Sequence, residues 1–380
     1  MEYVAPTPIS AETEARVLAH YGCEAGPLQH QPGTASSSAV VATPQGPLFL
    51  RRRRKEYSDE NVLRHDHALL HHLHNSGFPC TPPLRTVAGP TWATVEGELY
   101  EAFEFVPGEP YDPASADQVR EVGWTVGRLH ELTSDWQPPA PKPWLREDDP
   151  RLLREPLQEL TAQAEGDDCS ALLQAAELLE DVASHLPPQM YEALPQAVVH
   201  GDVHPGNVLF RDGRVVGLFD WDWTSRQARV RDLCDGLLFF AAAREQRIEP
   251  SDIRSLTQSW RLEPSRAAGV AAGYSTFHQL CDAERDACFW LLCSRWLQSR
   301  IRGARKVKVG ERVHFVIRGL FEPVEHLRRE WPQIAGALHG ARGAGVTPSE
   351  PGCRARSPFR APLGGAGDRE PTLQPPAGES

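Results

Sequence analysis

The hydrophobic positions of the first hundred residues predict a strand-rich unit that contains one main helix. Apolar runs on both sides of a turn at 43–46 predict a hairpin. Hydrophobic residues then recur at helical spacing over 59–73, and the stretch 75–77 ends that pattern. Residues 91–106 supply two more strands around a tight turn, and residues 11–21 fit a short helix.

After residue 110 the pattern changes to long stretches that predict helices. They cover 119–132, 171–186, 232–246 and 283–301, and one strand-rich segment interrupts them at 197–223. We therefore expect an N-terminal lobe over residues 1–106, joined near 104–108 to a helical C-terminal lobe over residues 107–335. Residues 340–380 are rich in Gly, Pro, Arg and Ser, which predicts a disordered tail.

The composition argues against several classes of protein. The 380 residues include 40 Lys or Arg and 51 Asp or Glu, so the formal net charge is −11 and binding to the phosphates of nucleic acid is not expected. No apolar run approaches the roughly 18 residues that a membrane-spanning helix requires. The eight cysteines form no Cys-x-x-Cys pair, which favours free thiols and a cytoplasmic location.

The strand-rich segment 197–223 contains the polar residues that suggest a chemistry. Asp202 lies in a loop after an apolar run, Asn207 begins the next run, and Asp220 follows a third. A turn at 211–214 makes the last two runs a hairpin, with Asn207 and Asp220 at its open end. Phosphoryl transfer uses one carboxylate to accept a hydroxyl proton, and an amide and a second carboxylate to hold Mg²⁺.

The motifs HGDVHPGN (200–207) and LFDWDW (218–223) resemble those of the aminoglycoside phosphotransferase family, which includes homoserine-, choline- and spore-coat-type kinases. The resemblance extends in lobe order over about residues 15–330. It implies an α+β, bilobal protein-kinase-like fold. In that fold a small antiparallel β-sheet lobe with one helix is followed by a larger, mainly helical lobe.

The resemblance also implies roles for residues of the two motifs. Asp202 would be the catalytic base, with Asn207 beside it in the catalytic loop. Asn207 and Asp220 would bind Mg²⁺, and Asp222 would be a further carboxylate near the metal. The two histidines of the first motif would shape the loop.

In the first lobe the resemblance implies a site for the ATP phosphates. Arg51 stands where the family has a lysine, and Asp66 on the following helix would be its ion-pair partner. The alternative is that residues 51–55 form an exposed basic run. Two hydroxyls of the preceding loop, Ser36 and Ser37, would contact phosphate.

The joint between the lobes would bind the adenine. The groups involved would be backbone groups of residues 104–106, among them Glu104 and Val106. The segments that determine the phosphate acceptor would lie after residue 110 and in residues 240–330, where no motif indicates a particular compound.

Other patterns allow other chemistries. Segment 197–223 could be a solvated hairpin, and its His and Asp residues could belong to a metallohydrolase. His67, His71 and His74 share one helical face, which suggests either a zinc site or, more simply, an exposed polar stripe. The basic residues between 295 and 312 fit a solvated helix end.

The sequence thus predicts an enzyme that uses ATP and Mg²⁺ to phosphorylate a hydroxyl of a small molecule, such as an amino sugar, homoserine or choline. The acidic excess of residues 111–240 weakly favours a positively charged acceptor. The alternative is a catalytically silent nucleotide-binding or spore-coat-like structural protein on the same fold. Neither nucleic acid nor a membrane is an expected partner, and the sequence does not indicate an oligomeric state.

Overall fold

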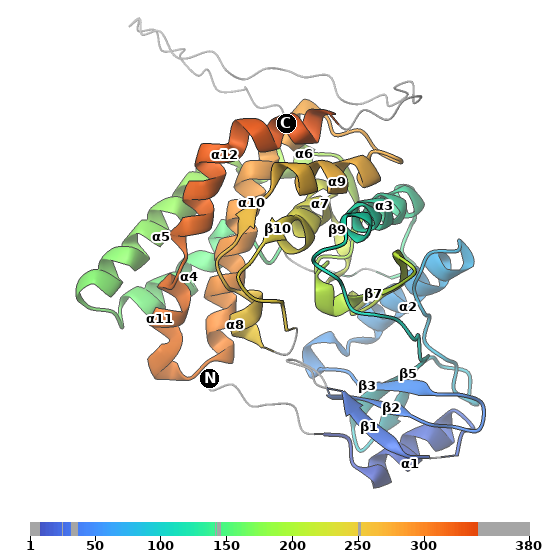
Figure 1. Ribbon diagram of the computed structural model, residues 1–380. Helices are drawn as coiled ribbons and strands as arrows, with labels where there is room; N and C mark the ends of the chain where they lie inside the picture. The colour runs from blue at the N-terminus through green and yellow to red at the C-terminus, as the bar shows by residue number, and fades with distance from the viewer. Residues whose placement is uncertain are drawn as a thin grey trace, which may run out of the picture. The chain divides into compact units, whose positions relative to one another are not determined.

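An antiparallel sheet with the strand order β1-β2-β3-β5-β4 forms the centre of the first lobe in the computed structural model (Figure 1). The structure describes residues 8–24, 26–31, 37–140, 142, 146–249 and 252–340. The strands are β1 (Leu28–Gln31), β2 (Ser37–Val41), β3 (Leu48–Arg52), β4 (Ala93–Val95) and β5 (Glu98–Glu104). The predicted hairpins are β2–β3 and β4–β5, and the polar strand β1 adds an edge that was not predicted.

The two faces of this sheet have different partners because side chains alternate along a strand. Helix α1 (Ala11–His20) covers one face, where its Val17 and Leu18 belong to one hydrophobic cluster with Leu48 and Leu50 of β3. The other face carries Arg51 of β3, and helix α2 (Glu60–Asn75), the predicted main helix, lies on that side. Asp59 caps that helix by accepting hydrogen bonds from backbone N–H groups of its first turn.

The second lobe is mainly helical and surrounds two short hairpin-like pairs of strands (Figure 1). Strand β6 (Gln196–Val199) pairs with β9 (Ser225–Ala228), and β7 (Val208–Arg211) pairs with β8 (Arg214–Leu218). A further short pair joins β10 (Ala242–Ala243) to β11 (Arg261–Leu262). The helices are α3 (Ala116–Thr133), α4 (Pro150–Thr161), α5 (Gly166–His185), α6 (Pro188–Ala193), α7 (Val230–Gly236), α8 (Ile253–Leu256), α9 (Pro264–Tyr274), α10 (Asp282–Gly303), α11 (Arg312–Ile317) and α12 (Phe321–Gly340).

Helices α3 and α9 pack closely because glycines lie at their contact. A Cβ atom on Gly123 would lie 2.0 Å from the carbonyl oxygen of Val270, and one on Gly273 would lie 2.0 Å from that of Arg120. No larger residue fits at either position without moving a helix backbone. Helix α3 also contacts β6 and β8, the strands next to the polar motifs.

The helix predicted over 232–246 is shorter than expected. Helix α7 ends at Gly236, a π-helical turn covers Leu237–Ala241, and the chain then enters β10. In a longer helix the carbonyl groups of Leu238 and Phe240 would accept hydrogen bonds from backbone N–H groups. Here side chains donate to them instead: Arg244 donates to Leu238, and Tyr111 and Arg266 donate to Phe240. These contacts turn the chain into the irregular segment 244–249.

The described residues include no helix that is long and apolar enough to cross a membrane. The seven cysteines within them are free thiols. The boundaries of the two lobes stay predictions, although helix α12 continues past residue 335 to Gly340. The tail expected from residue 340 lies, beyond Gly340 itself, outside the described residues.

Candidate active site

A loop between β6 and β7 presents the first motif, and one buried carboxylate holds it. Asp232 of α7 accepts hydrogen bonds from the backbone N–H groups of His200, at 2.6 Å, and Gly201, at 2.9 Å. Its Oδ2 also lies 3.2 Å from Nε2 of His130 on α3. Gly201 has a φ of +84°, and a Cβ there would lie 2.8 Å from the carbonyl oxygen of Trp223. These contacts fix the shape of the loop. The sequence did not indicate this role of Asp232, because its pattern showed only that residue 232 lies in a helix.

Asp202 projects from this loop with a side chain that is 29% exposed. Nδ2 of Asn207 donates to the Asp202 backbone carbonyl at 2.9 Å, and Nε2 of His204 lies 3.5 Å from its carboxylate Oδ2. Burial alone would raise the pKa of Asp202, but His204, together with Arg295 and His200, lowers it below its usual range. The pairing raises the pKa of His204 in turn. Asp202 is thus an ionised, partly accessible acceptor.

Asn207 and Asp220 lie at the open end of the β7–β8 hairpin, as predicted. The backbone N–H of Phe219 donates to the carbonyl of Asn207 at 2.9 Å, and Nε2 of His200 lies 2.8 Å from the Phe219 carbonyl. Asp220 has a φ of +61°, in the left-handed region, which marks a sharp change of chain direction after β8. The structure therefore brings together the three residues of the predicted catalytic set.

Arg51 of β3 and Arg53, just beyond the end of that strand, link the first lobe to these carboxylates. Arg51 donates from Nε and Nη2 to Glu101, at 2.9 and 2.7 Å, and its Nη1 lies 3.3 Å from Asp220. Asp222 contacts both arginines, at 3.1 Å from Arg51 and 3.3 Å from Arg53. The alternative of an exposed basic run is wrong for these two residues, whose side chains are 12% and 1% exposed.

The ion pair predicted between Arg51 and Asp66 is wrong. Asp66 pairs with Arg53 instead, and its Oδ1 lies 2.6 Å from Nζ of Lys142. Arg51 stands directly opposite Glu101 in the register of β3 and β5, so Glu101 takes the position expected of Asp66. Residue 53 lies on the same face, two positions farther along the chain, and reaches helix α2.

His67 corrects a second expectation, since it is buried rather than part of an exposed stripe. Its Nδ1 lies 2.6 Å from Oγ1 of Thr91, and its Nε2 lies 2.6 Å from Oε1 of Glu101. His67 is thus engaged by Thr91 and Glu101, and within the part of the chain that the structure describes no cluster of three or more His, Cys, Asp or Glu residues is placed to hold a metal ion by itself.

The two serines predicted to bind phosphate have different outcomes. Ser36 lies outside the described residues. Ser37 accepts a hydrogen bond from Arg52 at 3.0 Å, on the sheet face opposite Arg51, so its position does not favour a phosphate contact. Ser38 stands directly across from Arg51 in the β2–β3 register and is on the correct face. Strict alternation along the strand could have indicated Ser38 from the sequence.

The joint between the lobes is an exposed strand end. Glu104 is the last residue of β5, and the backbone N–H of Phe105 donates to the Pro47 carbonyl at 3.2 Å. On the adjoining sheet face, the rings of Phe49 and Phe103 lie with centroids 6.5 Å apart. Phe49 and Phe103 thus form an apolar wall beside the exposed end of β5, and such a wall suits a planar base. The adenine contacts of Glu104 and Val106 themselves stay a prediction.

The donor set at the hairpin suits a hard divalent cation. Asp220 is partly exposed, and desolvation together with the neighbouring Asp222 and Asp202 raises its pKa to about 6, although Arg51 acts in the opposite direction. A cation would relieve this crowding of carboxylates. Asn207 uses its amide nitrogen on Asp202, which leaves the amide oxygen to act as a ligand. Asp222 contacts arginines, so its predicted role near the metal has less support than that of Asp220 and Asn207.

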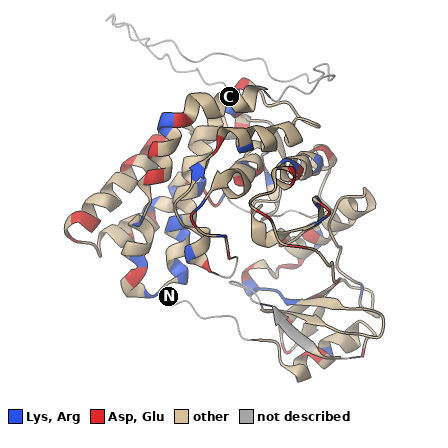
Figure 2. Ribbon diagram, in the orientation of Figure 1, with Lys and Arg blue, Asp and Glu red and all other residues tan. Residues whose placement is uncertain are grey.

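Basic residues are frequent along α10 and just after it (Figure 2), and the structure places some of them otherwise than at a solvated helix end. Arg295 and Arg300 of α10 are buried rather than solvated, and Arg295 donates to Asp235 at 2.6 Å. Burial lowers the pKa of Lys306, while Asp202 and Asp220 act in the opposite direction. Lys306 therefore belongs to the electrostatic surroundings of the catalytic carboxylates.

Comparison with known families agrees with this geometry. A family model described as "Phosphotransferase enzyme family" matches residues 29–268, which is more than half of the chain. The chain belongs to this family. A homoserine kinase of Sinorhizobium medicae is 28% identical over 293 residues, which cover 74% of this chain and 80% of the relative.

Solved structures of small-molecule kinases show the same fold. A microcompartment-associated aminopropanol kinase has a TM-score of 0.62 at 16% identity and covers 86% of this chain and 99% of its own. The amicoumacin kinase hAmiN, in complex with AMP-PNP, Ca²⁺ and amicoumacin, has a TM-score of 0.58 at 16% identity, with coverages of 78% and 89%. The predicted kinase-like fold is confirmed, and this phosphotransferase is a small-molecule kinase.

Proposed function

We propose that the protein transfers the γ-phosphoryl group of Mg·ATP to a hydroxyl of a small amino alcohol or hydroxy amino acid, with homoserine as the first candidate. The observation that carries this proposal is the meeting of Asp202, Asn207 and Asp220 at one hairpin end, opposite Arg51 of the first lobe. The homoserine kinase relative and the complex of hAmiN with AMP-PNP and Ca²⁺ support it.

In this reaction the acceptor oxygen forms a bond to the γ-phosphorus, and the bond from that phosphorus to the bridging oxygen of ADP breaks. Asp202 orients the acceptor hydroxyl and takes its proton. A bound Mg²⁺ would be held by Asn207 and Asp220 and would neutralise charge on the phosphates. Arg51 would bind phosphate oxygens from the first lobe, and His204 would keep the Asp202 carboxylate ionised and in position.

A catalytically silent protein on this fold is not favoured. A module that only binds nucleotide has no use for Asp202, which contacts neither Arg51 nor the predicted adenine site and instead has its own positioning contact from His204. The metal ligands alone would suffice for binding.

The test is a transfer assay with purified protein, Mg·ATP and a panel of acceptors that includes homoserine, 3-aminopropan-1-ol, choline and an amino sugar. Mass spectrometry identifies the phosphorylated product, and the Asp202→Asn variant is the control. We expect a monophosphate ester that the variant does not form at a comparable rate. Nucleotide binding without any Asp202-dependent product, across the panel, would favour the silent alternative.

A further inference from the structure

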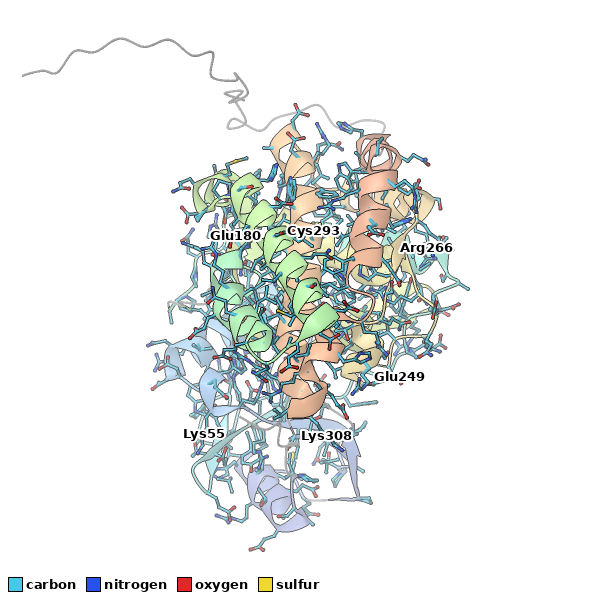
Figure 3. All side chains as sticks on the ribbon, turned by 90° about the vertical axis from the view of Figure 1, so that its left-hand side faces the viewer. Lys55, Glu180, Glu249, Arg266, Cys293 and Lys308 are labelled. Carbon is cyan, nitrogen blue, oxygen red and sulfur yellow. The ribbon has the colours of Figure 1, made fainter. Side chains whose placement is uncertain are left out.

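A cavity of about 530 Å³ adjoins the catalytic loop. Its walls come from the chain just after the joint, from the catalytic loop and from the segment around β10, and they include Tyr111, Pro205, Phe239, Arg244, Arg247 and Glu249. Figure 3 labels Glu249 and another lining residue, Arg266, on the same side of the helical lobe. The cavity is large enough for a small metabolite.

The cavity connects to the reacting groups through His204. The ring of Phe239, which lines the cavity, lies 5.8 Å from the ring of His204, and His204 contacts the Asp202 carboxylate at 3.5 Å. Pro205, next in the chain, also lines the cavity. The cavity therefore lies next to the catalytic loop, one side chain away from the Asp202 carboxylate, and the segment 244–249 forms its other wall.

Arg244 is a partly buried charged group of this wall that has no acidic partner within the described part of the chain. It is only partly exposed, and its guanidinium donates to the carbonyls of Leu238, at 2.6 Å, and Ala242, at 3.3 Å. No Asp or Glu of the described residues forms an ion pair with it at 4.0 Å or less. Burial without a counter-ion lowers the pKa of Arg244 to about 9.

Neighbouring arginines show how Arg244 differs. Arg266 is a structural residue, because it donates to the hydroxyl of Tyr111 and to the carbonyls of Phe240 and Pro113. Arg247 is exposed at the cavity and donates to the Tyr111 carbonyl at 3.1 Å. It likewise has no acidic partner within 4.0 Å among the residues described.

We infer that Arg244, assisted by Arg247, binds a carboxylate of the phosphate acceptor, so that the acceptor is a hydroxylated amino acid rather than a simple amino alcohol. A planar guanidinium matches a carboxylate in charge and shape. Glu245 and Glu249 also line the cavity and suit the ammonium group of the same molecule. This inference rests on the proposed function, and it adds a carboxylate to the acceptor that the sequence weakly predicted to be positively charged.

The experiment compares acceptors that differ only in the carboxylate. Three pairs serve: L-homoserine and 3-aminopropan-1-ol, L-threonine and 1-aminopropan-2-ol, and L-serine and 2-aminoethanol. For each pair kcat/KM is measured with Mg·ATP in the wild type and in Arg244→Gln. We expect the wild type to prefer the amino acid of at least one pair by about tenfold or more in kcat/KM. The variant should lose most of that preference because its kcat/KM for the amino acid falls, while its kcat/KM for the amino alcohol changes little.

The ratio within a pair is measured on one protein sample, so a smaller folded fraction in the variant cancels. Arg244→Lys tests the role of the guanidinium shape and should retain an intermediate preference. Arg120→Gln, an exposed arginine of α3 outside the cavity lining, is the matched control and should keep the wild-type ratio.

Two results would overturn the inference: a wild type that prefers the decarboxylated member of every pair it uses, or an Arg244→Gln variant that keeps the wild-type ratio. Asp202-dependent transfer only to compounds without an acidic group would overturn it as well, while leaving the proposed phosphotransferase function intact. Failure of that function is distinct, because no acceptor would then be phosphorylated in an Asp202-dependent manner.

Discussion

Nζ of Lys142 lies 2.6 Å from Oδ1 of Asp66, in a contact where both side chains are almost fully buried. The same ammonium group donates to Oγ1 of Thr224 at 3.0 Å, just after the segment that carries Asp220 and Asp222. Lys142 thus bridges helix α2 of the first lobe and the segment after Asp222, where Thr224 also donates directly to Asp66 at 3.2 Å. Burial lowers the pKa of Lys142, although Asp66 opposes this effect.

Lys142→Met should destabilise the protein by about 2–4 kcal/mol, because it leaves the buried Asp66 carboxylate with fewer positive partners. Denaturant unfolding measures this change. Lys55→Met is the matched control: Lys55 is 82% exposed and lies 3.7 Å from Glu98, so its loss should cost less than about 0.5 kcal/mol (Figure 3). Equal effects of the two substitutions would contradict the assigned role of Lys142.

Asp202→Asn should lower kcat by about 10²–10⁴-fold and leave the affinity for Mg·ATP within about threefold of the wild type. The reason is that Asn207, an expected metal ligand, donates mainly to the Asp202 backbone carbonyl, which the substitution retains, while the nearest partner of the carboxylate besides Asn207 is His204. Single-turnover transfer and calorimetric nucleotide binding separate the two quantities. A variant that binds Mg·ATP poorly but retains kcat would place Asp202 in the metal site instead.

Asp220→Asn should weaken binding of ATP in the presence of Mg²⁺ by about tenfold or more and make the affinity nearly independent of Mg²⁺ concentration. In the wild type, removal of the metal with EDTA should produce a similar loss, because the carboxylates beside Asp220 then face the phosphates without a cation. The readout is the thermal shift caused by ATP across a Mg²⁺ titration. An unchanged Mg²⁺ dependence in the variant would exclude Asp220 as a ligand.

Stability should fall between pH 7 and pH 5.5, partly because of His278. Burial and the nearby Arg229, which donates to Nδ1 of His278 at 3.1 Å, lower the pKa of this histidine to about 3. The unfolded chain, with a pKa near 6.5, then takes up a proton that the folded chain does not, so acid favours unfolding.

Over this interval the contribution of His278 is about 1 kcal/mol. His278→Gln retains an acceptor for Arg229 but does not titrate, so its unfolding free energy should decline less steeply on acidification. Denaturant midpoints at several pH values measure the slope. Identical slopes in the two proteins would show that His278 protonates equally well when folded.

The sequence predicted the parts of the site that depend on neighbouring residues. Asp202, Asn207 and Asp220 meet because they lie within one short segment whose turn and strand pattern place them together. The helix over 59–73 and both predicted hairpins of the first lobe also follow from local periodicity.

What the sequence could not show depends on register and on contacts between distant segments. Glu101, rather than Asp66, faces Arg51 because of the β3–β5 register, which no local pattern specifies. His67 looked exposed because its own helix gives no indication of Thr91 and Glu101 on the other side. Lys142 stood in a proline-rich stretch and gave no signal of its contact with Asp66.

The contact between Arg51 and Asp220 has a consequence for how the two substrates arrive. Without nucleotide, the arginine acts as a built-in counter-ion for the same carboxylate that the proposed function assigns to Mg²⁺. Under the proposed function, nucleotide entry would be an exchange of ionic partners, in which Asp220 would turn to the metal and Arg51 to the phosphates. The loop that carries Asp202 is held separately, by Asp232 and His204 from within the second lobe. We therefore expect acceptor and nucleotide to bind in random order, because the loop that would align the acceptor is shaped without that exchange.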